Sequence, residues 1–197
     1  MSQMKVTGCT IMMQAENPIP LHRRLAGWRI AGWSAAAALL ALPAISMQFG
    51  QGADWTGRDF AFAGIMLLVT GLAAEGGLRL ARSWPHLLGF ALAIFAGFFT
   101  VWSNLAVGII GDEDAAINSG FFAALLIAII AAALLRFRAR AMSIITGLLA
   151  VSQIMLGLAA RHLMPGHGVE WGILAMFAAL WLAASLCFRT EARRQAV

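Results

Sequence analysis

Two side-chain amides stand out in this sequence because they lie inside long apolar stretches. Asn104 falls near the end of the run 85–110, and Gln153 falls within the run 142–160. Hydrocarbon offers an amide no hydrogen-bond partner, so an amide kept there has a partner in the protein or faces a polar cavity. We expect the two amides to lie at similar depth. They either bond across a helix interface or line a polar pocket that opens outward.

An acidic segment follows the first of these amides. Asp112, Glu113 and Asp114 are consecutive and have no basic neighbour, and Asn118 comes four residues later. Carboxylate and amide oxygens on one face of a membrane protein suit the capture of a small polar solute or an ion. We therefore predict that a substrate or ion site, if the chain has one, uses this segment together with the two amides.

A single acid lies well inside an apolar run. Glu75 belongs to the run 60–80, and such a residue alone would suggest a proton relay or a cation site. Arg79 stands four residues later, on the same face of a helix. We therefore interpret Glu75 as one half of an ion pair with Arg79, and we keep a coupling-ion or gating role as the alternative.

Three further titratable side chains form a candidate metal site. His162, His167 and Glu170 fall in one polar segment, and imidazole with carboxylate suits zinc and similar metals. Their spacing matches no helical ligand motif, since Pro165 and Gly166 between the histidines indicate a turn. No Gly-rich phosphate loop, Cys-x-x-Cys, His-Glu-x-x-His or Gly-x-Ser-x-Gly motif is present. The sequence therefore implies no cofactor and does not indicate an enzyme.

The elements that must position these residues are six apolar runs. Hydrophobic residues make up 61% of the 197 residues and charged residues 12%, whereas soluble domains are about 45–50% apolar and about 25% charged. A run of about 20 apolar residues spans a membrane as a helix. The six runs cover residues 25–49, 60–80, 85–110, 121–135, 142–160 and 171–188. We predict an all-α polytopic membrane protein, a bundle of six transmembrane helices.

The basic residues predict how this bundle is oriented. Of the fourteen Lys and Arg residues, all except Arg58 and Arg161 flank one set of alternate loops. Positive loops stay in the cytoplasm, so both termini are predicted to be cytoplasmic in a bacterial inner membrane. Residues 1–24 would form an N-terminal tail, 25–188 the transmembrane domain and 189–197 a C-terminal tail. The net charge of +5 is explained by this orientation, and we predict no nucleic-acid partner.

One segment also resembles a known group of proteins. The stretch 102–114 reads Trp-Ser-Asn-Leu-Ala-Val-Gly-Ile-Ile-Gly-Asp-Glu-Asp. It is similar to a segment in small uncharacterised bacterial multi-pass membrane proteins, with the pattern W-x-N-x-A-V-G-I-I-G-x-E-D. The resemblance covers a small part of the chain and implies a bacterial multi-pass membrane protein without a known activity.

Three functional hypotheses follow from the residues. The first is a small-solute or ion transporter or channel with an outward-facing polar vestibule built by Asn104, Gln153 and the acidic segment. The second is a non-catalytic accessory or assembly subunit of a membrane complex, and the third is a metal-binding membrane enzyme. Besides the lipid bilayer, we expect a membrane-protein partner or a second copy of the chain.

Overall fold

The computed structural model describes residues 26–50, 54–111, 114–164 and 168–196, and all regular structure in these ranges is helical. Within these ranges, six long helices and one short 3-10 helix follow each other. They are α2 (Ala26–Gln48), α3 (Gly57–Leu80), α4 (Trp84–Ala106), η1 (Ala116–Asn118), α5 (Ser119–Leu134), α6 (Ala139–Leu163) and α7 (Trp171–Arg194). The all-α class predicted from composition is confirmed.

Each of the six long helices can cross a membrane by its length and apolar composition. Their candidate spans contain between 19 and 25 residues. At 1.5 Å per residue, such spans match a hydrocarbon core about 30 Å thick. The described helices therefore have the length and composition of a multi-pass membrane protein. The largest differences from the predicted ranges lie at three boundaries. Helix α4 ends at Ala106, four residues before the predicted end, and the fourth span begins with η1. Helix α7 continues to Arg194, so the predicted tail 189–197 begins as helix.

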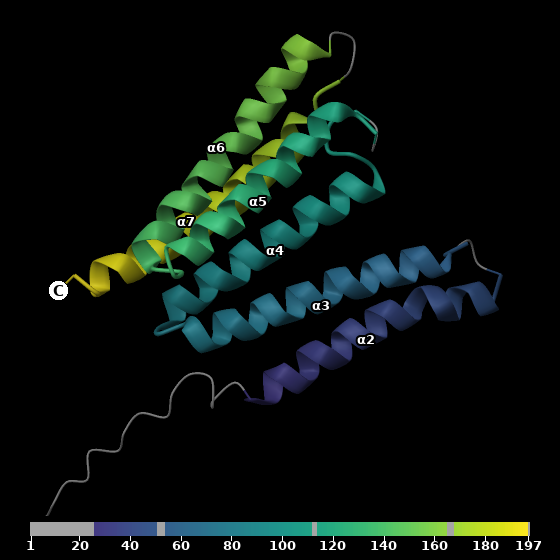
Figure 1. The fold of residues 1–197 in the computed structure, drawn as a ribbon, viewed down its shortest axis with the longest axis horizontal. Coiled ribbons are helices and arrows are strands. Elements are labelled where there is room, and N and C mark those ends of the chain that lie inside the picture. Colours follow the sequence, from purple (N-terminus) through teal and green to yellow (C-terminus); the bar gives the residue numbers. More distant parts are fainter. Residues whose placement is uncertain (1–25, 51–53, 112–113, 165–167, 197) are drawn as a thin grey trace, which may run out of the picture.

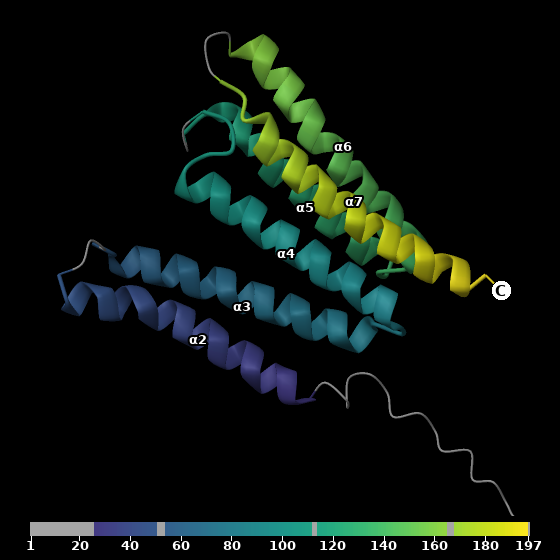
Figure 2. The ribbon, with the colours of Figure 1, turned by 180° about the vertical axis from the view of Figure 1, so that it is seen from behind.

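The helices fall into a four-helix bundle and a peripheral pair (Figure 1). Helices α4, α5, α6 and α7 form the bundle, in which α7 packs extensively against both α6 and α4. Helices α2 and α3 lie side by side beyond α4, and the opposite view shows the same arrangement (Figure 2). Helix α2 packs mainly on α3, and no residue of its span is buried in the protein. Most of its surface is therefore available to lipid or to a partner.

Successive helices run in opposite directions, so the molecule has two distinct ends. All arginines in the described ranges except Arg58 and Arg161 lie where α2, α4 and α6 begin and α3, α5 and α7 end. We call this the basic end, and it also receives the last turn of α7 (Figure 1). We call the opposite end, which carries Asp54, Asp59, Asp114 and Glu170, the acidic end.

The core of the bundle consists of two apolar clusters joined along α7. One contains Phe90, Trp181 and Phe188 and lies toward the basic end, and the other contains Phe121 and Phe177 and lies toward the acidic end. Glycines allow close packing between these helices. A Cβ added at Gly89 of α4 would lie 3.0 Å from two ring carbons of Phe188. Small residues therefore set the distance between α4 and α7.

A buried polar seam as the candidate functional site

Four polar side chains from three helices line the interior of the bundle where the two apolar clusters meet, and one of them, Trp181, also belongs to the first cluster. Thr100 and Asn104 come from α4, Gln153 from α6 and Trp181 from α7. Their relative exposures are 2%, 1%, 2% and 3%. We call these four residues the polar seam. Two of them, Asn104 and Gln153, are the amides that the sequence identified.

Packing contacts along α7 place Thr100 and Gln153 at the same depth. A Cβ at Gly97 of α4 would lie 3.8 Å from the Trp181 ring, and a Cβ at Gly157 of α6 would lie 2.5 Å from Leu174. Both α4 and α6 run antiparallel to α7. Thr100 lies about one turn after Gly97, and Gln153 lies about one turn before Gly157, so both residues reach the level of Phe177 on α7. Asn104 lies about one turn nearer the acidic end, and Trp181 about one turn nearer the basic end.

The hydrogen bonds of the seam leave three of its polar atoms without a partner. The Thr100 hydroxyl donates to the Ala96 carbonyl at 2.7 Å, and the Asn104 side-chain nitrogen donates to the Thr100 carbonyl at 2.7 Å. Asn104 Oδ1, Gln153 Oε1 and Trp181 Nε1 are buried and have no hydrogen-bond partner within the described ranges. The two amides are therefore not bonded to each other across the helix interface.

Three unsatisfied polar atoms in one core are unusual. Most buried polar side-chain atoms in proteins have a partner, and an unpaired one costs about 1–3 kcal/mol. Two of the three are carbonyl oxygens that accept hydrogen bonds, and the third is an indole N–H that donates one. These atoms lack the hydrogen bonds that a water or a bound polar group would supply at this position.

The connection from α4 to α5 covers the seam toward the acidic end. Ile109 and Ile110 in this connection are 2% and 0% exposed and pack on Phe121 and Phe177. Asn118 holds them: its Oδ1 accepts from the Ile110 amide at 3.2 Å, and its Nδ2 donates to the Ile110 carbonyl at 3.1 Å. Asn118 therefore fixes a closing segment, and the seam is enclosed where the sequence predicted an outward opening.

The acidic segment is only partly described. Asp112 and Glu113 lie outside the described residues, and Asp114 is exposed at the acidic end. Gly108 and Gly111 on either side of the isoleucines have φ angles of 74° and 70°, which favour glycine. The acidic segment therefore follows directly after the closing segment in the sequence. Of its three acids, the described Asp114 lies on the surface, outside the seam.

Glu75 lies in an ionic cluster at the basic end of α3. Its Oε1 is 3.1 Å from an Arg79 guanidinium nitrogen, and its Oε2 accepts from Arg29 Nε at 2.9 Å. The Glu75 side chain is 13% exposed, against 45% for Arg29 and 69% for Arg79. The structure thus contains the predicted pair with Arg79, and it adds a second arginine from α2 that sequence spacing could not reveal.

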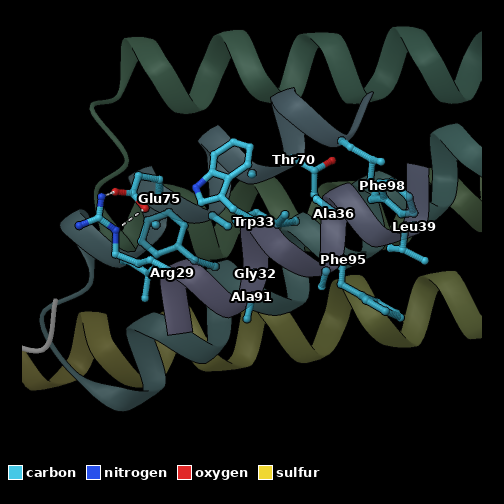
Figure 3. A pocket seen from close by; sticks show the side chains of 18 of the residues that line it. Arg29, Gly32, Trp33, Ala36, Leu39, Thr70, Glu75, Ala91, Phe95 and Phe98 are labelled. Carbon is cyan, nitrogen blue, oxygen red and sulfur yellow. Dashed lines mark hydrogen bonds and ion pairs between the residues drawn. The ribbon is translucent and has the colours of Figure 1, made fainter. Parts of the chain in front are cut away.

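An apolar cleft lies beside this ionic cluster (Figure 3). It has a volume of about 580 Å³ and lies between α2, α3 and α4. Its wall is almost entirely apolar, with Trp33 and Phe95 among its aromatic side chains, and the pair of Arg29 with Glu75 lies at its edge. The cleft separates part of the peripheral pair from the bundle.

The predicted metal ligands are not assembled in the described ranges. His162 at the end of α6 and Glu170 before α7 are both exposed, and His167 lies outside the described residues. No group of three His, Cys, Asp or Glu side chains within the described ranges is arranged to hold a metal ion. The metal hypothesis therefore gains no geometric support from these residues.

A second buried polar cluster, at the basic end, was missed by the sequence analysis. Glu191 of α7 is 3% exposed, accepts a short hydrogen bond from the Ser83 hydroxyl, and accepts from Gln195 Nε2 at 2.8 Å. His86 is also 3% exposed and stacks on Phe90. The sequence does contain one sign of this cluster. Glu191 is an acid among the arginines at the end of α7, where the helix dipole disfavours a negative charge. This cluster ties the start of α4 to the end of α7.

Comparison with protein-family models, with curated proteins and with solved structures found no match to this chain. The seam, the cleft and the charged ends are therefore the features from which a function can be inferred.

Proposed function

We propose that this chain is a small-solute transporter of the bacterial inner membrane, with both termini in the cytoplasm. The observation that supports this is the polar seam, where Asn104, Gln153 and Trp181 each keep a polar atom unsatisfied inside the bundle. A core selected for stability alone would replace such groups with apolar ones. The seam is proposed as the binding position of the solute in an occluded state.

The chemistry of the seam favours an uncharged polar solute over an ion. The unsatisfied atoms are two amide oxygens and one indole N–H, and none of the four seam residues carries a charge. An ion in this position would lie in a low-dielectric interior without a counter-charge, at high cost. A small molecule with hydroxyl or amide groups would pair with Gln153 Oε1 and with Asn104 Oδ1 or Trp181 Nε1, which lie about one turn to either side of it.

Access to the seam is proposed to require movement of the closing segment. Ile109 and Ile110 cover the acidic end of the seam, and the Asn118 side chain bonds both backbone groups of Ile110. Gly108 and Gly111 flank the isoleucines, and glycines tolerate the backbone rotations that such an opening needs. The outward vestibule predicted from the sequence would then exist only in the open state.

Solute uptake into liposomes tests the proposal. Stopped-flow light scattering would follow reconstituted protein against a panel of small neutral solutes, such as polyols and amides. We expect accelerated entry of at least one solute, loss of this entry in Gln153→Met, and normal entry in Ser152→Ala, whose hydroxyl bonds the Leu149 carbonyl. Equal rates with empty and protein-containing liposomes for the whole panel would overturn the proposal.

The proposed orientation has a separate test. A reporter active only in the cytoplasm, fused after Val197, should be active, and a cysteine placed at Arg138 should resist impermeant thiol reagents added from outside. A Cys9→Ser, Cys187→Ser background removes the native thiols. An inactive reporter together with labelling at position 138 would reverse the assignment of the two ends.

A second candidate function, that of an accessory subunit, is favoured by the cleft. Helix α2 has no buried residue in its span, and the cleft beside it is apolar and wide. A helix from a partner membrane protein would bury the exposed surface of α2 and fill the cleft. Ala91→Phe, on the cleft wall, should then remove a partner that co-purifies in mild detergent, whereas Ala133→Phe on the exposed face of α5 should retain it. Retention by both variants would count against a partner in the cleft.

A further inference from the structure

A second pocket lies at the basic end, between α6 and α7, and its lining differs in chemistry from that of the cleft. It has a volume of about 490 Å³. Three arginines lie at its wall: Arg140 from α6, and Arg189 and Arg193 from α7. The hydroxyls of Ser143 and Ser185 line it as well. The pocket thus collects three positive charges and two hydrogen-bonding groups from two helices.

The packing of α6 on α7 explains why these side chains converge. The Ser185 hydroxyl donates to the Ser143 carbonyl at 2.6 Å, which fixes the register of the two antiparallel helices. Arg140 lies one turn before Ser143, and Arg189 lies one turn after Ser185, so both arginines reach the same level. Arg193 follows one turn beyond Arg189. The convergence is therefore a property of the fold and goes beyond the general excess of arginine at this end.

The three arginines have no carboxylate partner in the described ranges. The ion pairs found there both involve Glu75, on the far side of the molecule. Glu191 is close in sequence, yet its carboxylate is buried and accepts from Ser83 and Gln195. Three guanidinium groups in one pocket, with no counter-charge among the described residues, attract a strongly anionic group such as a phosphate. Guanidinium binds a phosphate with two parallel hydrogen bonds.

The surface on the membrane side of the pocket is apolar. Ile144, Leu182 and Leu186 line it and are 59%, 51% and 53% exposed. Each of them lies three or four residues from an arginine or serine of the pocket, on the same helix face and on the side toward the middle of the membrane. A ligand that fills the pocket and continues over these residues needs an anionic head and a hydrocarbon tail.

From these observations we infer that the pocket between Arg140, Arg189 and Arg193 binds the headgroup of an anionic phospholipid, with an acyl chain lying over Ile144, Leu182 and Leu186. The phosphate would contact the guanidinium groups, and the serine hydroxyls would donate to its oxygens or to the glycerol. Basic pockets between transmembrane helices are known to bind such headgroups. The inference does not depend on the proposed transport activity.

Native mass spectrometry of delipidated full-length protein tests the inference, with mixed micelles of phosphatidylglycerol and phosphatidylcholine as the probe. We expect the wild-type chain to retain phosphatidylglycerol preferentially. Each arginine near the headgroup is worth about fivefold in affinity, so the triple variant Arg140→Gln, Arg189→Gln, Arg193→Gln should lose about a hundredfold. The single variants should lose graded amounts, which keeps the test informative if the triple variant folds poorly.

A matched control removes the same charge elsewhere at the same end. The triple variant Arg82→Gln, Arg136→Gln, Arg138→Gln neutralises three exposed arginines that do not line the pocket, and it should keep the lipid preference. Equal loss in both triple variants would show general electrostatic attraction and overturn a specific site. Unchanged preference in the pocket variants, or full competition by inorganic phosphate, would overturn it as well.

Discussion

Replacing Gln153 by methionine should stabilise the protein while it removes the proposed transport. Gln153 is 2% exposed and its Oε1 has no partner in the described ranges. An unpaired buried carbonyl costs about 1–3 kcal/mol, and methionine has nearly the same length and flexibility as glutamine. We expect Gln153→Met to raise the free energy of unfolding by about 1–2 kcal/mol.

The assay is thermal unfolding of purified protein in detergent, followed by the fluorescence of the seven tryptophans. For a chain of this size, about 1 kcal/mol corresponds to about 2–4 °C, so the midpoint should rise by about 2–8 °C. Ser152→Ala on the neighbouring position is the control, because its hydroxyl bonds the Leu149 carbonyl at 2.8 Å and lies outside the seam. Its midpoint should change little.

The opposite sign would refute the reasoning about the seam. If Gln153 instead formed a hydrogen bond between helices, its loss would destabilise the protein by about 0.6–2 kcal/mol, the range measured for such bonds in membranes. A lower midpoint for Gln153→Met would therefore mean that the amide is structural. A higher midpoint with lost solute entry would show the trade of stability for activity expected of a binding site.

Three further variants test other parts of the structure by the same unfolding assay. Asn118→Leu leaves both backbone groups of Ile110 unpaired and should destabilise the protein by about 2–4 kcal/mol, whereas a neutral effect would deny the closing role of this amide. Glu75→Gln should lower the free energy of unfolding by at most about 1 kcal/mol, because the two arginines that pair with Glu75 are largely exposed. Loss of a pH-dependent activity in this variant would point instead to proton coupling. Gly89→Ala should destabilise the protein by about 1–3 kcal/mol, because the new Cβ meets the buried ring of Phe188. Gly76→Ala, where the Cβ would meet open space, should be neutral or slightly stabilising. Equal effects of the two substitutions would contradict the close packing at Gly89.

The membrane helices could be predicted because they depend on local composition. Each apolar run appears as a helix with ends within a few residues of the prediction, except where α7 extends through its arginines to Arg194. That extension contains Glu191, which accepts a hydrogen bond from Ser83, a residue far away in the sequence. The grouping into a bundle and a peripheral pair also depends on long-range packing, which periodicity does not encode.

The candidate site was predictable only in its residue types. Asn104 and Gln153 were found because an amide in an apolar run is conspicuous, and both belong to the seam. Trp181 could not be identified from the sequence, since an indole in an apolar run gives no sign of an unsatisfied N–H. Asn118 was grouped with the solute site, although its amide bonds the Ile110 backbone. Both roles are set by tertiary surroundings that residue type alone does not reveal.

The position of α7 between α4 and α6 determines when the interior of the bundle is completed during synthesis. Helix α7 is the last of the described helices to be made, and it supplies extensive packing to both neighbours. Until it inserts, Asn104 and Gln153 lack the wall that shields them from acyl chains. A nascent chain that stalls before residue 171 would thus present bare amides to the bilayer, the feature by which membrane quality-control proteases could distinguish an unfinished molecule from a finished one.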